Sequence, residues 1–116
     1  MSRTIALDFD GVLHSYTSGW TGPKPVDAPV PGALALVEAP KARKYKLVVF
    51  TARDDIAAVG EWLKQHGFPA MTVTKTKPKA ALYVDDRGLR FDGNPKTILD
   101  FVDGDPELRS WTDPKR

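Results

Sequence analysis

Short apolar runs alternate along the chain with segments whose apolar residues recur at helical spacing. Apolar runs bounded by Gly, Pro, Asp and Lys are typical of β-strands. The run at 45–51 is nearly continuously apolar, which suits a strand in a sheet covered on both faces. The pattern predicts four strands, at residues 4–7, 45–51, 70–74 and 81–84.

Three segments have the spacing of amphipathic helices. The first is expected to be short or kinked, because Pro40 lacks the N–H that a helix interior needs. The second begins after Asp54 or Asp55, either of which can cap it, and ends at Gly67. The third begins at Pro95. Their apolar faces are Ala33, Leu34, Leu36 and Val37, then Ile56, Val59, Trp62 and Leu63, then Ile98, Leu99, Phe101 and Val102.

Strands that alternate with helices predict an α/β fold: a three-layer, Rossmann-like, mainly parallel sheet with helices on both faces. At 116 residues the chain fits one domain, 1–116, without a repeat, linker or cap domain. Residues 14–32 are rich in Gly, Pro, Ser and Thr and predict a long loop near the site. Residues 89–91 are expected to form a last strand or a turn.

The composition excludes several classes of protein. The absence of cysteine rules out disulfides, thiolate metal sites and cysteine nucleophiles. No stretch approaches the roughly 20 apolar residues of a membrane span, and the N-terminus lacks the apolar region of a signal peptide. We therefore expect a cytoplasmic protein without a membrane partner. The net charge of +2 indicates no particular partner.

Unusual polar residues follow three of the predicted strands. Asp8 and Asp10 end the first, Thr51 ends the second, and Asp85 and Asp86 end the fourth. In a parallel sheet the carboxyl ends of the strands meet at one edge, where ligands bind. Four carboxylates there repel one another and require a cation. With no soft ligand nearby, Mg²⁺ fits best.

A sheet edge that carries several carboxylates and a cation suits phosphoryl transfer. One carboxylate can attack phosphorus and form an aspartyl-phosphate, and a second can donate a proton to the leaving group and then activate water. A hydroxyl and a lysine are needed to hold the transferring phosphoryl oxygens. Thr51 supplies the hydroxyl, and Lys77 or Lys79 supplies the cation.

The order of these motifs resembles that of the haloacid dehalogenase-like (HAD) superfamily. The motifs are DFDGV, a hydrophobic strand ending in Thr51-Ala52-Arg53, Lys77-Pro78-Lys79, and LYVDD. The match runs from Leu7 to Asp86. The segment HSYTSGW and the IDDR-like VDDR resemble small, minimally capped members of this superfamily in bacteria and phages.

The resemblance implies a Mg²⁺-dependent phosphatase, a phosphomonoester hydrolase. Asp8 would be the nucleophile and would also bind Mg²⁺. Asp10 would be the general acid and base, with its backbone carbonyl on the metal. Thr51 and the amides after it, beginning with Ala52, would bind the phosphoryl group.

The resemblance assigns the remaining roles, in metal binding and phosphoryl contact, to residues of the two later motifs. Asp85 would be the principal further Mg²⁺ ligand, with Asp86 beside it as a ligand or in contact with one. Lys77 precedes a proline, as in the Lys-Pro form of the lysine motif, and is favoured for the phosphoryl contact. Lys79 lies closer in sequence to Asp85 and is the alternative.

Only the 14–32 loop and a short stretch after Thr51 stand in place of a cap domain, which predicts an open site. Such a site suits large substrates such as nucleic-acid ends or phosphoproteins, or a small phosphorylated molecule with the loop as a partial lid. Tyr16 and Trp20 could stack on a base, but packing within the loop is favoured. Arg53 is expected to pair with a nearby acid, and His14 and His66 to be surface or loop residues. The alternative functions are a catalytically weak module that binds Mg²⁺ and phosphate, and a nucleic-acid-end phosphatase acting with a partner. A response-regulator receiver domain has a different order of motifs.

Overall fold

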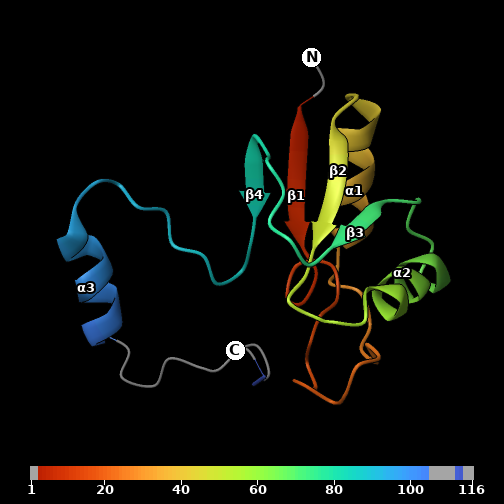
Figure 1. The fold of residues 1–116 in the computed structure, drawn as a ribbon, viewed down its shortest axis with the longest axis horizontal. Helices are drawn as coiled ribbons and strands as arrows, with labels where there is room; N and C mark the ends of the chain where they lie inside the picture. Colours follow the sequence, from red (N-terminus) through yellow and green to blue (C-terminus); the bar gives the residue numbers. More distant parts are fainter. Residues whose placement is uncertain (1–2, 105–111, 114–116) are drawn as a thin grey trace.

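A computed structural model of the protein describes residues 3–104 and 112–113. The described residues form one parallel sheet with the strand order β3-β2-β1-β4 (Figure 1). The predicted α/β, Rossmann-like fold with a parallel sheet is therefore confirmed, and the described residues include no cap domain. The helices expected on both faces are not seen among the described residues, because the two helices that pack on the sheet share one face. The elements are β1 (Thr4–Asp8), α1 (Ala33–Ala42), β2 (Lys46–Phe50), α2 (Ile56–Gln65), β3 (Thr72–Thr74), β4 (Leu82–Val84) and α3 (Pro95–Gly104).

One face of the sheet carries the hydrophobic core. In β1, Ile5 and Leu7 pair with Leu47 and Val49 of β2 and point to the same face, because side chains alternate along a strand. Helices α1 and α2 pack on this face through a buried cluster that includes Val37. The other members from the helices and their flanks are Ala33, Val59, Trp62, Leu63 and Phe68.

The opposite face of the sheet carries the side chains of Asp8 and Asp85 at its carboxyl edge. Ala6 and Asp8 point to this face by the same alternation, and Ala6 pairs with Tyr83 of β4. Continuing the alternation past Val84 places Asp85 on the same side as Asp8. The carboxyl ends of the two adjacent strands thus bring these two acids to one edge.

Helix α1 differs from its prediction. It runs through Pro40 to Ala42, so the proline does not end it. Pro40 lies in the last turn of the helix, so its missing N–H removes only one backbone hydrogen bond near the helix end. The Arg43 N–H then closes the helix on the Ala39 and Pro40 carbonyls.

Helix α2 follows its prediction. The carboxylate of Asp55 accepts the Ala58 N–H at 2.9 Å and caps the first turn. Val59, Trp62 and Leu63 are buried. Gly67 takes the left-handed conformation just after the helix, with φ 79°.

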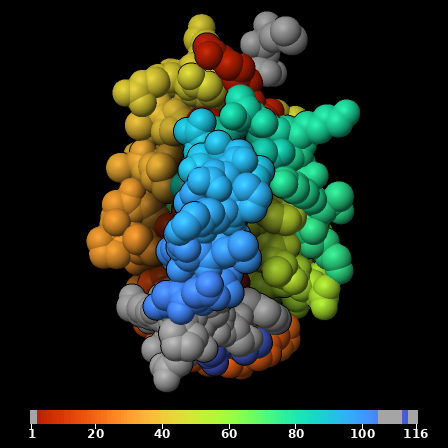
Figure 2. All heavy atoms as spheres, turned by 90° about the vertical axis from the view of Figure 1, so that its left-hand side faces the viewer, coloured from red at the N-terminus to blue at the C-terminus, as the bar shows by residue number. Residues whose placement is uncertain are grey.

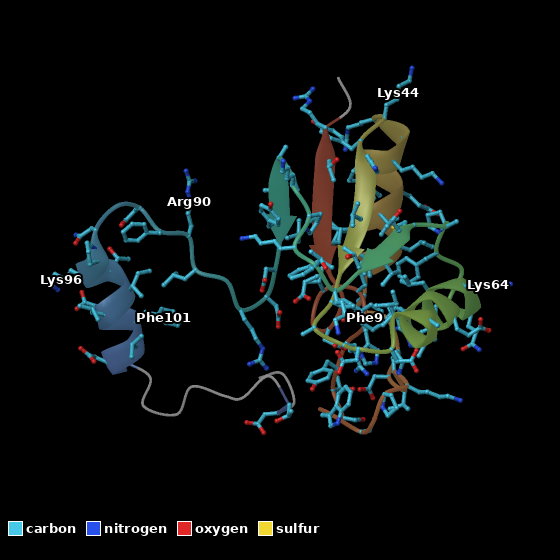
Figure 3. All side chains as sticks on the ribbon, in the orientation of Figure 1. Phe9, Lys44, Lys64, Arg90, Lys96 and Phe101 are labelled. Atoms are coloured by element: carbon cyan, nitrogen blue, oxygen red, sulfur yellow. The ribbon has the colours of Figure 1, made fainter. Side chains whose placement is uncertain are left out.

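The chain beyond β4 leaves the sheet. Residues 89–91 form no strand, and α3 packs against none of the other described helices and strands. Figures 1 and 2 show α3 beyond β4, and Figure 3 shows Phe101 on it and Arg90 on the connection. Leu99, Phe101 and Val102 are exposed. Among the described residues, no helix is long and apolar enough to cross a membrane.

Candidate functional site

Three carboxylates meet at the carboxyl edge of the sheet. Oxygen atoms of Asp8, Asp85 and Asp86 all lie within 4.8 Å of one another. Asp8 ends β1, and the two other acids follow β4, its neighbour in the sheet. The Asp85 Oδ1 accepts the N–H groups of Arg87 at 2.7 Å and Gly88 at 3.1 Å, which fixes the direction of this side chain. The predicted convergence of these three acids is therefore observed.

Burial and the two neighbouring carboxylates raise the pKa of Asp8. Burial raises the pKa of Asp8 to about 8, and the charge of Asp85 and a hydrogen bond with Asp86 act in the same direction. The Phe9 N–H, 2.9 Å from Asp8 Oδ1, acts in the opposite direction. The metal-free site therefore holds a proton where three ionised carboxylates would repel one another.

A small hard cation fits this set of donors. All the ligand atoms are carboxylate oxygens, which Mg²⁺ prefers. With Mg–O distances of about 2.0–2.1 Å, oxygens on opposite sides of one ion lie roughly 4.2 Å apart. Separations up to 4.8 Å need only small side-chain rotations to reach this geometry. Asp85 and Asp86 are exposed, so water and a substrate oxygen can complete the coordination.

Asp10 lies outside the three-acid cluster. In an extended strand, residues 8 and 10 would point to the same side, but β1 ends at Asp8 and the chain turns at Gly11, with φ 87°. Including the Asp10 carboxylate among the metal ligands is not supported, since the group of acids that could hold an ion in the described structure omits it. The role of its backbone carbonyl stays a prediction.

The Asp10 carboxylate is held by two partners. Arg53 Nε donates to Oδ2 at 2.8 Å and Nη2 donates to Oδ1 at 3.0 Å. His14 Nδ1 lies 2.8 Å from Oδ1. Burial alone would raise the pKa of Asp10, but the hydrogen bonds from His14 and Arg53 and the charge of Arg53 hold the pKa below its usual value. Asp10 is therefore kept ionised.

His14 lies in the loop, as predicted, but it is buried rather than on the surface. Its side chain is buried and stacks on the Phe9 ring, with centroids 5.2 Å apart. The Asp27 N–H donates to Nε2 at 3.0 Å, so Nε2 is an acceptor and Nδ1 carries the proton donated to Asp10. No second histidine lies at ligand spacing from His14, so its spacing gave no signal of this role. His66 stays exposed, as predicted.

Thr51 and Ala52 follow β2 at the same edge as the acids. The hydroxyl oxygen of Thr51 accepts the Arg53 N–H at 3.1 Å, and the Thr51 N–H donates to the Thr74 carbonyl at 2.9 Å. Thr51 is buried, whereas Ala52 is exposed. The two bonds fix the turn after β2. Phosphoryl binding by Thr51 and the following amides stays a prediction.

The two candidate lysines occupy different surroundings. Lys77 Nζ lies 4.8 Å from the centroid of the Tyr83 ring, and the Tyr83 hydroxyl donates to the Pro78 carbonyl at 2.6 Å. Tyr83 points to the same face of the sheet as Asp8, so its ring places Lys77 on the side of the acids. Lys79 is exposed. The assignment to Lys77 stays a prediction that this placement supports.

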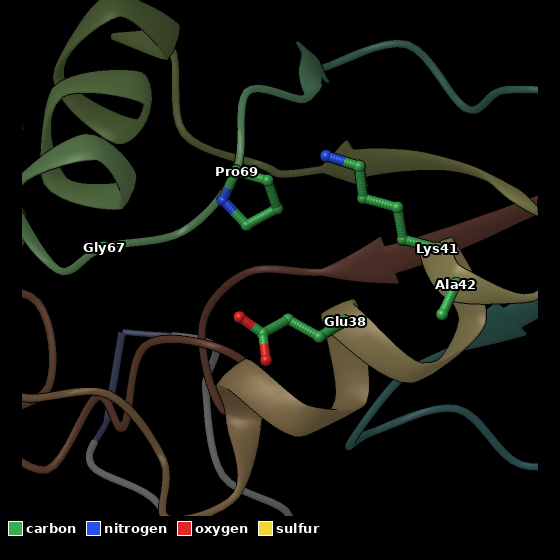
Figure 4. Close-up of a pocket in the computed structure, with 5 residues that line it drawn as sticks. All are labelled: Glu38, Lys41, Ala42, Gly67 and Pro69. Atoms are coloured by element: carbon green, nitrogen blue, oxygen red, sulfur yellow. The ribbon is translucent and has the colours of Figure 1, made fainter.

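A separate hollow lies between α1 and the α2–β3 connection (Figure 4). Its volume is about 480 Å³, and Glu38, Lys41, Ala42, Gly67 and Pro69 line it. These residues precede β2 and β3, at the amino ends of the parallel strands. The acids lie at the carboxyl ends, so this hollow is not part of the candidate site.

The fold has a counterpart among solved structures. A conserved protein of Bacteroides thetaiotaomicron superposes with a TM-score of 0.61 over 90% of this chain and 92% of that protein, at 21% sequence identity. At this identity the likeness supports the fold alone. The chain matches no family model and no curated protein.

Proposed function

We propose that this protein is a Mg²⁺-dependent phosphomonoester hydrolase that works through an aspartyl-phosphate on Asp8. The observation that carries the proposal is the meeting of Asp8, Asp85 and Asp86 at the carboxyl edge of a parallel sheet. The order of motifs along the chain, which resembles the HAD superfamily, supports the same conclusion.

Bound Mg²⁺ would screen the negative charges of the substrate and the carboxylates. Asp85 and one oxygen of Asp8 would hold it, with Asp86 as a further ligand or in contact with one, and the other oxygen of Asp8 attacks phosphorus. The P–O bond to the leaving group breaks as the Asp8–phosphorus bond forms. Water then releases phosphate from Asp8 and regenerates the carboxylate.

The other residues hold the phosphoryl group and move the proton. Thr51 and the Ala52 amide contact the phosphoryl oxygens, and Lys77 offsets their charge. Asp10 must first take up a proton, which it then gives to the leaving oxygen, and the resulting carboxylate takes a proton from the attacking water. Because Arg53 and His14 occupy both of its oxygens, one of these bonds must give way to the reacting oxygen. The exposed acids and the absence of a cap in the described residues suit a small phosphorylated molecule or a nucleic-acid end.

A second candidate function is a module that binds Mg²⁺ and phosphate but turns over slowly. The observation that favours it is the lowered pKa of Asp10, since a proton donor must first be protonated. A slow release of phosphate despite normal binding would identify this module.

The test is a screen of phosphorylated metabolites, nucleotides and 3′- or 5′-phosphorylated oligonucleotides with Mg²⁺. We expect hydrolysis of at least one class by the natural protein and none by Asp8→Asn. We also expect beryllium trifluoride, which mimics a phosphoryl group on a carboxylate, to attach to Asp8 in a crystal structure or by ¹⁹F NMR. Substantial Mg²⁺-dependent activity of Asp8→Asn would replace the covalent route by direct attack of water.

A further inference from the structure

The side chain of Arg53 is buried, with 2% of its surface exposed, at the centre of contacts between the site and the 14–32 loop. Its Nε and Nη2 atoms hold the two oxygens of Asp10, as described above. Its Nη1 atom donates to the carbonyls of Gly22 at 3.3 Å and Pro23 at 3.4 Å. One guanidinium therefore joins an acid that follows β1 to the middle of the loop.

Aromatic rings complete the surroundings of this guanidinium. Its Cζ atom lies 4.9 Å from the centroid of Trp20, 5.8 Å from that of Tyr16 and 5.9 Å from that of Phe9. Trp20 and Tyr16 belong to the loop, and Phe9 follows Asp8. The faces of aromatic rings attract cations, so these rings stabilise the buried charge.

A second connection ties Asp10 to the far end of the loop. His14 donates to Asp10 and accepts the Asp27 N–H. The Asp27 carboxylate in turn accepts from Ser18 N–H at 2.9 Å and Ser18 Oγ at 2.6 Å, and its carbonyl accepts the Trp62 Nε1 hydrogen at 2.9 Å. Gly22 and Pro23 thus connect to the Asp10 carboxylate through Arg53, and Asp27 connects to it through His14. Asp27 also connects the loop to α2 through Trp62.

We propose that Arg53 is a positioning residue that fixes the Asp10 carboxylate and fastens the 14–32 loop over it, so that the acid and the loop move as one unit. This inference rests on the proposed phosphatase function and adds a residue to it. Substrates that require the loop to shift then also release Asp10, which couples loop position to turnover. Lysine cannot replace Arg53, because an ammonium group lacks the planar fork that contacts two carboxylate oxygens and two carbonyls.

The first test compares the kinetics of Arg53→Lys with the natural protein, using the best substrate from the screen. The conservative charge should preserve the fold, checked by circular dichroism and thermal melting. We expect kcat to fall roughly 10- to 100-fold, the range for a misplaced catalytic group, while KM changes little. Arg90→Lys, on the exposed connection beyond β4, is the matched control and should behave like the natural protein.

A double-mutant cycle separates positioning from a general loss of structure. If Arg53 acts through Asp10, Arg53→Lys should slow the natural protein but change kcat little in an Asp10→Asn background. An equal fold-loss in both backgrounds would overturn the proposal and leave Arg53 with a merely structural role. An unchanged kcat in Arg53→Lys would overturn it as well, while the proposed function stands.

Hydrogen exchange tests the connection without any need for activity. Peptides covering residues 14–32 should exchange faster in Arg53→Lys and in Asp10→Asn, whereas Arg90→Lys should match the natural protein. Unchanged exchange of these peptides in both variants would overturn the coupling of loop and acid. If the natural protein hydrolyses no phosphate in the screen, the proposed function fails, and the catalytic role of Arg53 fails with it even where exchange shows the coupling.

Discussion

Arg53 binds both carboxylate oxygens of Asp10, with Nε 2.8 Å from Oδ2 and Nη2 3.0 Å from Oδ1. The side chain of Arg53 is 2% exposed and that of Asp10 16% exposed, so this ion pair is shielded from water. Two lysine ion pairs, Lys75–Asp54 and Lys96–Asp100, lie on the surface instead. The buried pair therefore distinguishes this site from the ordinary charged surface of the protein.

Breaking this pair should destabilise the fold. Arg53→Met keeps much of the apolar stem but leaves the Asp10 carboxylate without its cation. Removing one partner of a buried pair costs about 3–5 kcal/mol of the free energy of unfolding. Urea unfolding followed by circular dichroism measures it. Lys75→Met, which breaks an exposed pair, is the control and should change the unfolding midpoint little. An Arg53→Met variant as stable as this control would contradict the prediction.

The stability of the metal-free protein should fall as the pH rises from about 4 to about 8. The native protein holds a proton on Asp8, whose pKa is raised to about 8, whereas the unfolded chain releases it near the ordinary aspartate pKa of 3.8. Between these values the native state binds more protons, so the free energy of unfolding decreases with pH.

Urea unfolding in EDTA at pH 5, 6, 7 and 8 measures this dependence. Asp8→Asn removes the titrating group and should flatten the decline over the same range. Saturating Mg²⁺ should also reduce the decline, because the ion replaces the proton at the cluster. The same slope in Asp8→Asn and in the natural protein would show that another group causes it.

Asp85 and Asp86 should determine the affinity for Mg²⁺. We expect Asp85→Asn to weaken binding by roughly tenfold or more, at least as much as the loss of a group that merely orients a metal ligand. Asp86→Asn should weaken it by a similar factor if Asp86 is a ligand and by less if it only contacts one. Isothermal titration calorimetry measures both. Asp92→Asn, an exposed acid on the connection beyond β4, should leave the affinity unchanged.

Lys77→Ala should lose far more phosphatase activity than Lys79→Ala. The position of the Lys77 ammonium over the Tyr83 ring, on the face that Asp8 shares, gives the physical reason. Both lysines are exposed, so neither change should alter the melting temperature much. Steady-state kinetics on the best substrate makes the comparison. If Lys79→Ala is the slower variant, the lysine of this motif is Lys79.

The sequence alone predicted the parallel sheet and the meeting of Asp8, Asp85 and Asp86 at one edge. The apolar run of β2 and the helical spacing of Val59, Trp62 and Leu63 are local patterns that burial selects directly. Asp8 and Asp85 follow strands that run in the same direction, so their meeting at one edge follows from topology. The pairing of Arg53 with an acid was also expected from the residue type.

Tertiary structure decided what surrounds Asp10. β1 ends at Asp8, and the Asp10 carboxylate bonds to Arg53 and His14 rather than joining Asp8, which alternation along an extended strand does not predict. Arg53 lies 43 positions further along the chain, and the His14 ring is buried because the loop folds back over Phe9 and Trp62. Such contacts depend on how distant segments pack. A local pattern specifies which residues are buried, but the partner of a buried charge is set only when the chain brings the two groups together.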